Sequence, residues 1–469
     1  MEFTELADYA IPAGALVEWL PCATGPWEPD PRPVSYIHER HLLRSAAGSG
    51  DTSWLGTAFE IDGPLDADAF KAALRRWTDR HEVLRSHTAL DSGTGNVSRH
   101  TIPAGGIDIG VVDHGYDATG QDNFEHLHQL FDDYASPHSW PSYVFATLTR
   151  RGGDGPFTVF FAADHSIIDG FSIVLIAHEI TALYREALCG SASHLFPVGS
   201  YVDFGARERE LMTDSESEDA AVDLWRRALG DGGLARFPLP IGERSAEPQN
   251  GLSTWLLDAE GSQAFSSVCG SVGVGYFAGL LSCLAVVGHD LAGKDHFQVI
   301  TPVHTRSSQE WAGALGWFVG LCPVEFAADD ASFDVLARRA AEATAAVKPA
   351  AAIPFDRVGE RLGRPISPRF VVSYMDVRFV PEAAQWPERN ARALRSRAYT
   401  HDVYLWLNRT PRGLNLAIRY PNNGVANAAV HSYVAALRQA IGAASDGAFA
   451  STDTTAGDSY PPVAFQAAT

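Results

Sequence analysis

The sequence predicts an α/β protein built from two lobes. A chain of 469 residues is roughly two to three times as long as a typical single domain. The apolar run FTVFFAAD, 157–164, has the length of a buried strand, and a helical pattern follows it up to the turn-rich segment 189–200. That segment is the candidate linker. We therefore expect an N-terminal lobe at 1–188, a C-terminal lobe at 200–442 and a flexible tail at 443–469.

Composition argues against several classes of protein. The formal charge is −21, from 36 Lys plus Arg against 57 Asp plus Glu, which disfavours binding to nucleic acid or to an anionic membrane. The N-terminus carries acids where a secretory signal would be basic, and the apolar run 276–288 is too short to span a bilayer. We expect a cytoplasmic protein without a transmembrane segment. Its five scattered cysteines form no CxxC pair, which disfavours both a disulfide framework and a zinc ribbon.

Two helices flank the buried strand. Asp66 is a candidate N-cap, and Phe70, Ala73, Leu74 and Trp77 follow it on one apolar face. After Gly170 the apolar positions again recur at helical spacing until Cys189-Gly190. The stretch DHSIIDG, 164–170, is therefore predicted to be a tight strand-to-helix loop.

His165 is the candidate catalytic residue of this loop. An imidazole has an ordinary pKa near 6.5, so it is the side chain best able to take a proton from an alcohol or amine at neutral pH. The alternative is a structural histidine without a catalytic role, which is the more frequent case at the end of a strand. Free backbone N–H groups at Gly170, where the next helix opens, could stabilise an oxyanion.

Asp169 has two candidate roles. It could orient the imidazole of His165 directly, or it could brace the loop by pairing with a distant arginine. The second is preferred, because a carboxylate this close in the loop rarely reaches the ring behind it. Asp164, His165 and Asp169 could also ligate a metal, although no HExxH motif accompanies them.

Other motifs are weak or missing. The sequence GVGYFAG, 273–279, is one residue too long for a dinucleotide fingerprint and lacks a strong preceding strand. There is no GxSxG elbow of a serine hydrolase and no Walker-type phosphate loop.

Five stretches together resemble one known family. DHSIIDG resembles the HHxxxDG signature of the CoA-dependent acyltransferase superfamily, which includes the condensation domains of nonribosomal peptide synthetases. The other stretches agree in order and spacing over roughly 14–440: PVSYIHERHLL (33–43), RHEVLRSHT (80–88), SYVDFGARERE (200–210), and TPVHTRS with LGWFVGLCPVEF (301–326). Details such as GWFVG and IPFDRV look closest to the polyketide-associated acyltransferases of actinobacteria.

The resemblance implies a fold and a set of roles. The family fold is α/β, with two chloramphenicol-acetyltransferase-like lobes forming a V around a central tunnel. His165 matches the catalytic histidine, Gly170 the glycine beside the reacting carbonyl, and Asp169 the structural aspartate. Arg306 is the expected partner of Asp169. Asp164 departs from the pattern of peptide-forming domains, which usually carry a histidine at this position. Some ester-forming relatives resemble this sequence in having DH. The charge of Asp164 should hold the loop and favour the imidazolium of His165.

The implied activity is transfer of an acyl group from a thioester to a hydroxyl, with an amine as the second choice of acceptor. The donor is acyl-coenzyme A or an acylated carrier protein, and no cofactor or metal is bound permanently. Two alternatives stay open: a non-catalytic module that recruits carrier proteins, and a condensation-like enzyme that forms an amide or modifies a tethered chain.

Two further sets of residues are candidates for binding. The run RNARALRSR, 389–397, is basic in an acidic chain, so Arg392 and Arg395 could dock a carrier protein or the phosphates of coenzyme A; the alternative is a solvated basic face. Trp311 and Trp317 could line the tunnel, with core packing as the alternative.

Overall fold

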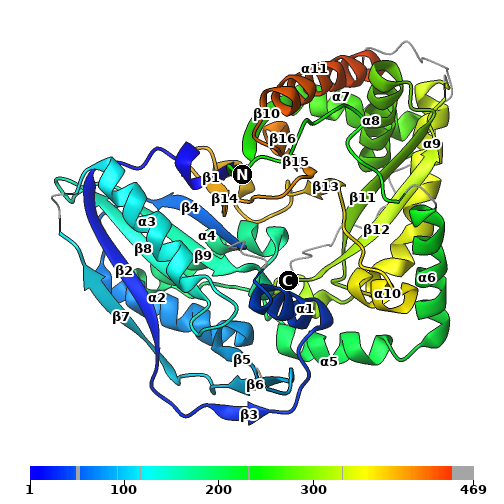
Figure 1. Ribbon diagram of the computed structural model, residues 1–469. Coiled ribbons are helices and arrows are strands. Elements are labelled where there is room, and N and C mark those ends of the chain that lie inside the picture. Colours follow the sequence, from blue (N-terminus) through cyan, green and yellow to red (C-terminus); the bar gives the residue numbers. More distant parts are fainter. Residues whose placement is uncertain (49–52, 92, 116–117, 231–232, 330, 446–469) are drawn as a thin grey trace. The chain divides into compact units, whose positions relative to one another are not determined.

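The computed structural model describes residues 1–48, 53–91, 93–115, 118–230, 233–329 and 331–445. It divides into two compact units (Figure 1). Unit 1 contains Met1–Thr213, Arg306–Phe318 and Phe379–Ala398; unit 2 contains the remaining segments, Asp214–Thr305, Val319–Arg378 and the chain from Tyr399 onward. Both units combine a sheet with covering helices, so the predicted two-lobe α/β class is confirmed.

The units depart from the expected boundaries. The irregular segment 190–200 lies inside unit 1, and the chain passes to unit 2 only after Thr213. The physical reason is the helix that follows 200: its Tyr201 bonds to Ser35 through the two hydroxyl oxygens, 2.7 Å apart, and packs edge-on against Phe318. Of the expected tail, residues 446–469 lie outside the described residues.

Unit 1 is organised around a seven-stranded sheet of order β1-β14-β4-β9-β8-β2-β7. Neighbouring strands run antiparallel except β1 and β14, which run parallel. A smaller sheet has the order β3-β6-β5. The strands are β1 Glu2–Glu5, β2 Gly14–Ala23, β3 Glu28–Asp30, β4 Trp54–Ile61, β5 Ser86–Leu90, β6 Val97–Thr101, β7 Ile107–Asp113, β8 Tyr143–Arg150, β9 Phe157–Asp164 and β14 Arg392–Arg395, and the helices are α1 Tyr36–Ala46, α2 Ala67–Arg80, α3 Gly120–Tyr134, α4 Gly170–Cys189 and α5 Tyr201–Leu211.

Strand β9 is buried on both faces, as predicted. On one face, Phe160 and Ala162 pack with Phe131 of α3, which crosses that side of the sheet (Figure 1). On the other face, Phe161 lies edge-on to Trp77 of α2, at 5.6 Å between ring centroids. Helices on both faces exclude water from β9, so its end is a rigid platform for the loop that follows.

The two predicted helices of unit 1 are confirmed with their ends. The side chain of Asp66 accepts a hydrogen bond from the N–H of Ala69 at 2.9 Å and caps α2. Helix α4 begins at Gly170 and ends at Gly190, whose φ of 70° lies in the left-handed region that glycine adopts without strain.

Unit 2 contains a six-stranded mixed sheet of order β10-β16-β15-β13-β11-β12. Helices α7, α8, α9 and α11 pack on one face of it, and α6 and α10 pack on the other. The elements are α6 Ser215–Leu229, β10 Asn250–Asp258, α7 Ala259–Ser271, α8 Tyr276–Ala292, β11 His296–His304, β12 Val319–Ala327, α9 Phe333–Val347, α10 Phe355–Leu362, β13 Phe370–Asp376, β15 Val403–Thr410, β16 Gly413–Tyr420 and α11 Gly424–Ser445.

Among the described helices, none has by itself the length and apolarity to cross a membrane. Helices α7 and α8 reach that threshold only as a pair, which is bent by 95°.

Gly56 tests the pairing of β4 with β9. A Cβ at this position would lie 2.4 Å from the carbonyl oxygen of Phe161, so a methyl group there forces the two backbones apart. We expect Gly56→Ala to lower the free energy of unfolding by about 1–3 kcal/mol in urea titrations. Gly155→Ala is the matched control, because nothing lies within 4 Å of its added Cβ. Equal stability of the two variants would contradict the close approach.

Candidate functional site

His165 lies where the platform of β9 ends. It opens a short 3₁₀ turn, His165–Ile167, and its N–H donates to the carbonyl of Ser53 at 2.9 Å. Its half-buried imidazole stacks on the indole of Trp317, with 3.9 Å between ring centroids and 26° between planes. The backbone and one face of the ring are therefore both fixed.

Burial lowers the pKa of His165 below the ordinary value of a histidine. The nearby His41 lowers it further, whereas the residue's own carbonyl and the carboxylates of Asp164 and Asp169 act in the opposite direction. An imidazole with a lowered pKa is neutral at pH 7, and the neutral form is the one that can accept a proton.

Asp164 is tied to a residue that the sequence analysis did not single out. Its Oδ2 lies 3.2 Å from Nε2 of His41 on α1, and its Oδ1 accepts a hydrogen bond from the N–H of Ser166 at 2.9 Å. Burial alone would raise the pKa of Asp164, but His41 and the bonds from Ser166 outweigh it and leave the pKa below its usual value. Asp164 is therefore a buried carboxylate that holds the loop. His41 lies inside the quoted stretch PVSYIHERHLL, but nothing in its spacing indicated this partner.

Asp169 and Arg306 form a buried ion pair. The two terminal nitrogens of the guanidinium reach the carboxylate at 2.6 and 3.1 Å, and the side chains are 2% and 6% exposed for Asp169 and Arg306 respectively. Burial alone would raise the pKa of Asp169, but Arg306 and the bonds from Ser172 hold it below its usual value. Asp169 thus braces the loop, and within the described part of the chain no hydrogen bond joins its carboxylate to the imidazole of His165.

The ion pair joins two distant parts of the chain. Asp169 caps α4 by accepting from the N–H of Ser172 at 2.7 Å, and it also accepts from the N–H of Phe318 at 3.1 Å. Arg306 donates to the carbonyls of Trp311 and Ala314 at 3.2 and 3.1 Å. These bonds hold the segment 306–318 in place, and that segment carries Trp317 to its position on His165.

Gly170 is the first residue of α4. The N–H groups of a first helical turn have no carbonyl partner within the helix, and the Asp169 side chain takes the one from Ser172. The role of the other N–H groups near Gly170 in stabilising a developing negative charge stays a prediction.

The two tryptophan candidates differ. Trp317 is half-buried, stacks on His165 and lies edge-on to His41 at 5.6 Å. Trp311 is buried and packs against Phe204 and Phe318 at 5.2 and 6.4 Å. Only Trp317 therefore contacts the candidate base; Trp311 is placed as a core residue.

Arg392 and Arg395 differ in how far they reach the surface. Both lie in β14, the second strand of the unit 1 sheet, where Arg392 is near Glu2 at 3.8 Å and Arg395 near Glu5 at 3.6 Å. The side chain of Arg395 is only 5% exposed. A residue so buried offers little charge to a docked carrier protein, whereas the side chain of Arg392 is 26% exposed and stays a candidate.

The three acidic and histidine residues of the loop do not converge as metal ligands. Asp164 faces His41 and Asp169 faces Arg306. Within the described ranges, the one group whose ligand atoms gather is Glu18, His114 and His126.

Comparison with known proteins gives the family of this chain. A model of the condensation domain family matches residues 32–403. The acyltransferase PapA3 of Mycobacterium tuberculosis is 27% identical over 457 residues, covering 92% of this chain and 94% of the relative. PapA1 of Mycobacterium bovis, named a 2'-acyl-2-O-sulfo-trehalose (hydroxy)phthioceranyltransferase, is 28% identical over 463 residues, covering 93% and 88%. The solved structure of a PapA2 acyl transferase is similar with a TM-score of 0.85 at 24% identity, covering 95% of this chain and 100% of that one.

The chain therefore belongs to the condensation domain family. It is an acyltransferase, related to the mycobacterial Pap enzymes, as the resemblance in its motifs indicated.

The ion pair supports a stability prediction. Arg306→Ala leaves the buried carboxylate of Asp169 without its counter-charge, and such a loss costs about 3–5 kcal/mol. We expect urea titrations to show that decrease in the free energy of unfolding. In the control Arg207→Ala, the exposed pair with Glu210 is lost, at about 0–1 kcal/mol. A loss at Arg306 as small as that of the control would refute the brace.

Proposed function

We propose that this acyltransferase moves an acyl group from a thioester donor to a hydroxyl acceptor, with His165 as general base. The observation that carries the proposal is the state of His165. It is fixed at the end of a buried strand, stacked on Trp317 and held neutral by burial, which together suit a base for an alcohol.

In the proposed reaction, His165 takes the proton of the acceptor hydroxyl while its oxygen bonds to the thioester carbonyl carbon. The negative charge that develops on the carbonyl oxygen is stabilised by backbone N–H groups at the start of α4, near Gly170. The carbon–sulfur bond then breaks, and the imidazolium returns the proton to the leaving thiolate. Asp164 and Asp169 remain ionised throughout and stabilise the imidazolium electrostatically.

The donor is proposed to be acyl-coenzyme A or an acyl group on the phosphopantetheine arm of a carrier protein. Both donors present the same reacting thioester, so the role of His165 is the same with either of them. The burial of Arg395 weakens its candidacy as a docking residue, whereas Arg392 keeps a side chain that is 26% exposed. The two donors are therefore distinguished by the test below.

The proposed acceptor is a carbohydrate hydroxyl. The name of PapA1 includes an acylated, sulfated trehalose, and the match to PapA1 covers 93% of this chain. An amine acceptor, as in amide-forming members, is the second candidate, and it uses the same base.

The catalytic role of His165 predicts a large loss of turnover. Mass-spectrometric assays would combine a panel of acyl-coenzyme A and acyl-carrier-protein thioesters with trehalose-type sugars and amines. We expect His165→Ala to reduce product formation by about 10²–10⁴-fold, because the proton must then go to water. The matched control is His431→Ala on the exposed side of α11, which should keep wild-type turnover. Equal turnover in His165→Ala would rule out the base.

The surroundings of His165 predict opposite shifts in the pH profile. Replacing Trp317 by leucine admits water to the ring, so the pKa of His165 rises and the acid limb of kcat/KM moves to higher pH. Asp164→Asn removes a charge that raises this pKa, so the acid limb moves to lower pH. Both profiles come from initial rates between about pH 4.5 and 8.5, a range of about two units on either side of the ordinary histidine value. Shifts in the same direction would contradict this account of the electrostatics.

A further inference from the structure

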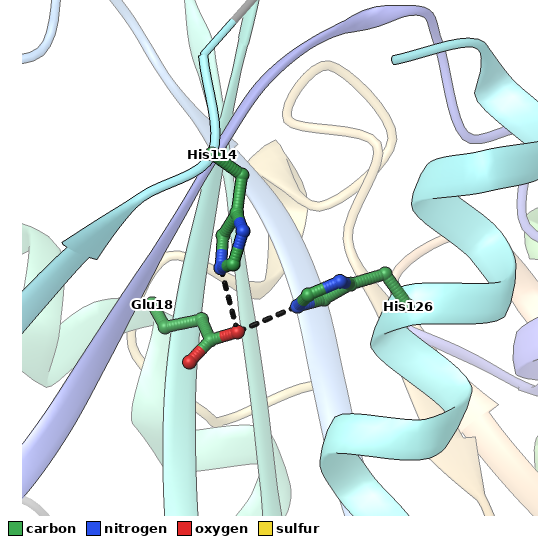
Figure 2. A group of neighbouring side chains, drawn as sticks. All are labelled: Glu18, His114 and His126. Atoms are coloured by element: carbon green, nitrogen blue, oxygen red, sulfur yellow. Dashed lines mark hydrogen bonds and ion pairs between the residues drawn. The ribbon is translucent and has the colours of Figure 1, made fainter.

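Three side chains of unit 1 converge at a place that the proposed reaction does not use. Glu18 comes from β2, His114 directly follows β7, and His126 comes from α3. Figure 2 shows both rings pointing toward the same carboxylate oxygen, with Nε2 of His114 at 2.8 Å and Nε2 of His126 at 2.5 Å from Oε1 of Glu18. The three candidate ligand atoms lie within 4.8 Å of one another.

The fold itself holds these residues together. Glu18 pairs with Val112 of β7, and the N–H of His114 continues the pairing by donating to the carbonyl of Leu16 at 3.0 Å. Helix α3 packs Leu127 into the core that also contains Leu16, and His126 is the neighbour of Leu127. The edge of the sheet and helix α3 thus hold both imidazoles beside Glu18 before any ligand binds.

The carboxylate of Glu18 is paired with imidazoles at this place. The side chain of Glu18 is 11% exposed, and among the described residues its ionic partners are the two histidines, with no lysine or arginine. Burial raises the pKa of nearby Tyr134, and the negative charge of Glu18 raises it further. A buried carboxylate needs a positive charge close by, and a cation bound by the two imidazole nitrogens would supply one.

We propose that Glu18, His114 and His126 bind one divalent transition-metal ion of the zinc type. Two imidazole nitrogens and one carboxylate oxygen form a ligand set that zinc takes, with a fourth position left for water. Bonds of about 2.0–2.1 Å in a tetrahedral site separate the ligand atoms by roughly 3.3 Å. Each nitrogen now lies 2.5 or 2.8 Å from Oε1 of Glu18, so a bound ion would require these atoms to move apart by less than about 1 Å.

The site is separate from the candidate base. Glu18 lies opposite Ala146 of β8, and Ala146 lies opposite Phe160 of β9, so His165 is two strands across and five residues along. Strand spacing and rise make that roughly 15–20 Å. The metal would therefore act as a clip between α3 and the edge of the sheet, and the acyl transfer would not pass through it.

The test uses the full chain after treatment with a chelator, titrated with Zn²⁺ and with Co²⁺. We expect one equivalent of Zn²⁺ to bind and to raise the thermal unfolding midpoint, because a ligand that prefers the folded state stabilises it. Bound Co²⁺ should give the visible absorption of a tetrahedral site. Glu18→Gln, which keeps the size of the side chain, and the double variant His114→Asn/His126→Asn should each lose about tenfold or more in affinity.

The matched control is His128→Asn. His128 lies on the same helix and pairs with Asp132 at 3.2 Å, outside the cluster, so the variant should bind Zn²⁺ as the wild type does. If the wild type binds neither ion, or if the double variant binds Zn²⁺ as tightly as the wild type, the proposal is overturned. A double variant that fails to fold leaves Glu18→Gln and the Co²⁺ spectrum to decide.

Discussion

The ion pair between Asp169 and Arg306 joins the loop of His165 to the segment that carries Trp317. Asp169 belongs to the loop of His165, whereas Arg306 belongs to a segment 137 residues further along the chain. Because the carboxylate also caps α4 and accepts from the N–H of Phe318, one side chain sets the start of a helix and the position of the segment 306–318. That segment supplies Trp317, the ring on which His165 stacks. A buried pair of this kind contributes placement more than net stability, since desolvation offsets much of its attraction.

The chemistry at His165 depends on a balance between burial and charge. Burial disfavours the imidazolium, which keeps the ring neutral and ready to accept a proton. The carboxylates of Asp164 and Asp169 favour the imidazolium, so they lower the free energy of the charged ring once the proton has been taken. His41 engages Asp164 and moderates that attraction. A base must hold its proton only briefly, and opposing influences of this kind suit that task.

The sequence was sufficient for features that depend on neighbouring residues. The caps of α2 and α4, the buried strand β9 and the loop of His165 follow from local spacing and from turn chemistry. Arg306 was placed beside Asp169 through the family resemblance, because no local pattern joins residues so far apart. His41 and the burial of Arg395 were missed for the same reason: both depend on which strand or helix lies alongside, and β14 enters the sheet between β1 and β4. The cluster of Glu18, His114 and His126 was missed because each of these residues comes from a different part of the chain.

The division of the chain into units explains why sequence order misleads here. Unit 1 takes Arg306–Phe318 and Phe379–Ala398 from the C-terminal half, and the first of these segments contains both the brace and the stacked tryptophan. One compact unit therefore contains the whole candidate site: His41, His165, Asp169, Arg306 and Trp317. Along the chain, His41 and Trp317 are 276 positions apart (317 − 41). A boundary drawn at 188 would place the base and its supports in different lobes. Since the buried ion pair requires all of them to be ordered together, the base, its brace and its stacking partner should form or be lost as one cooperative element.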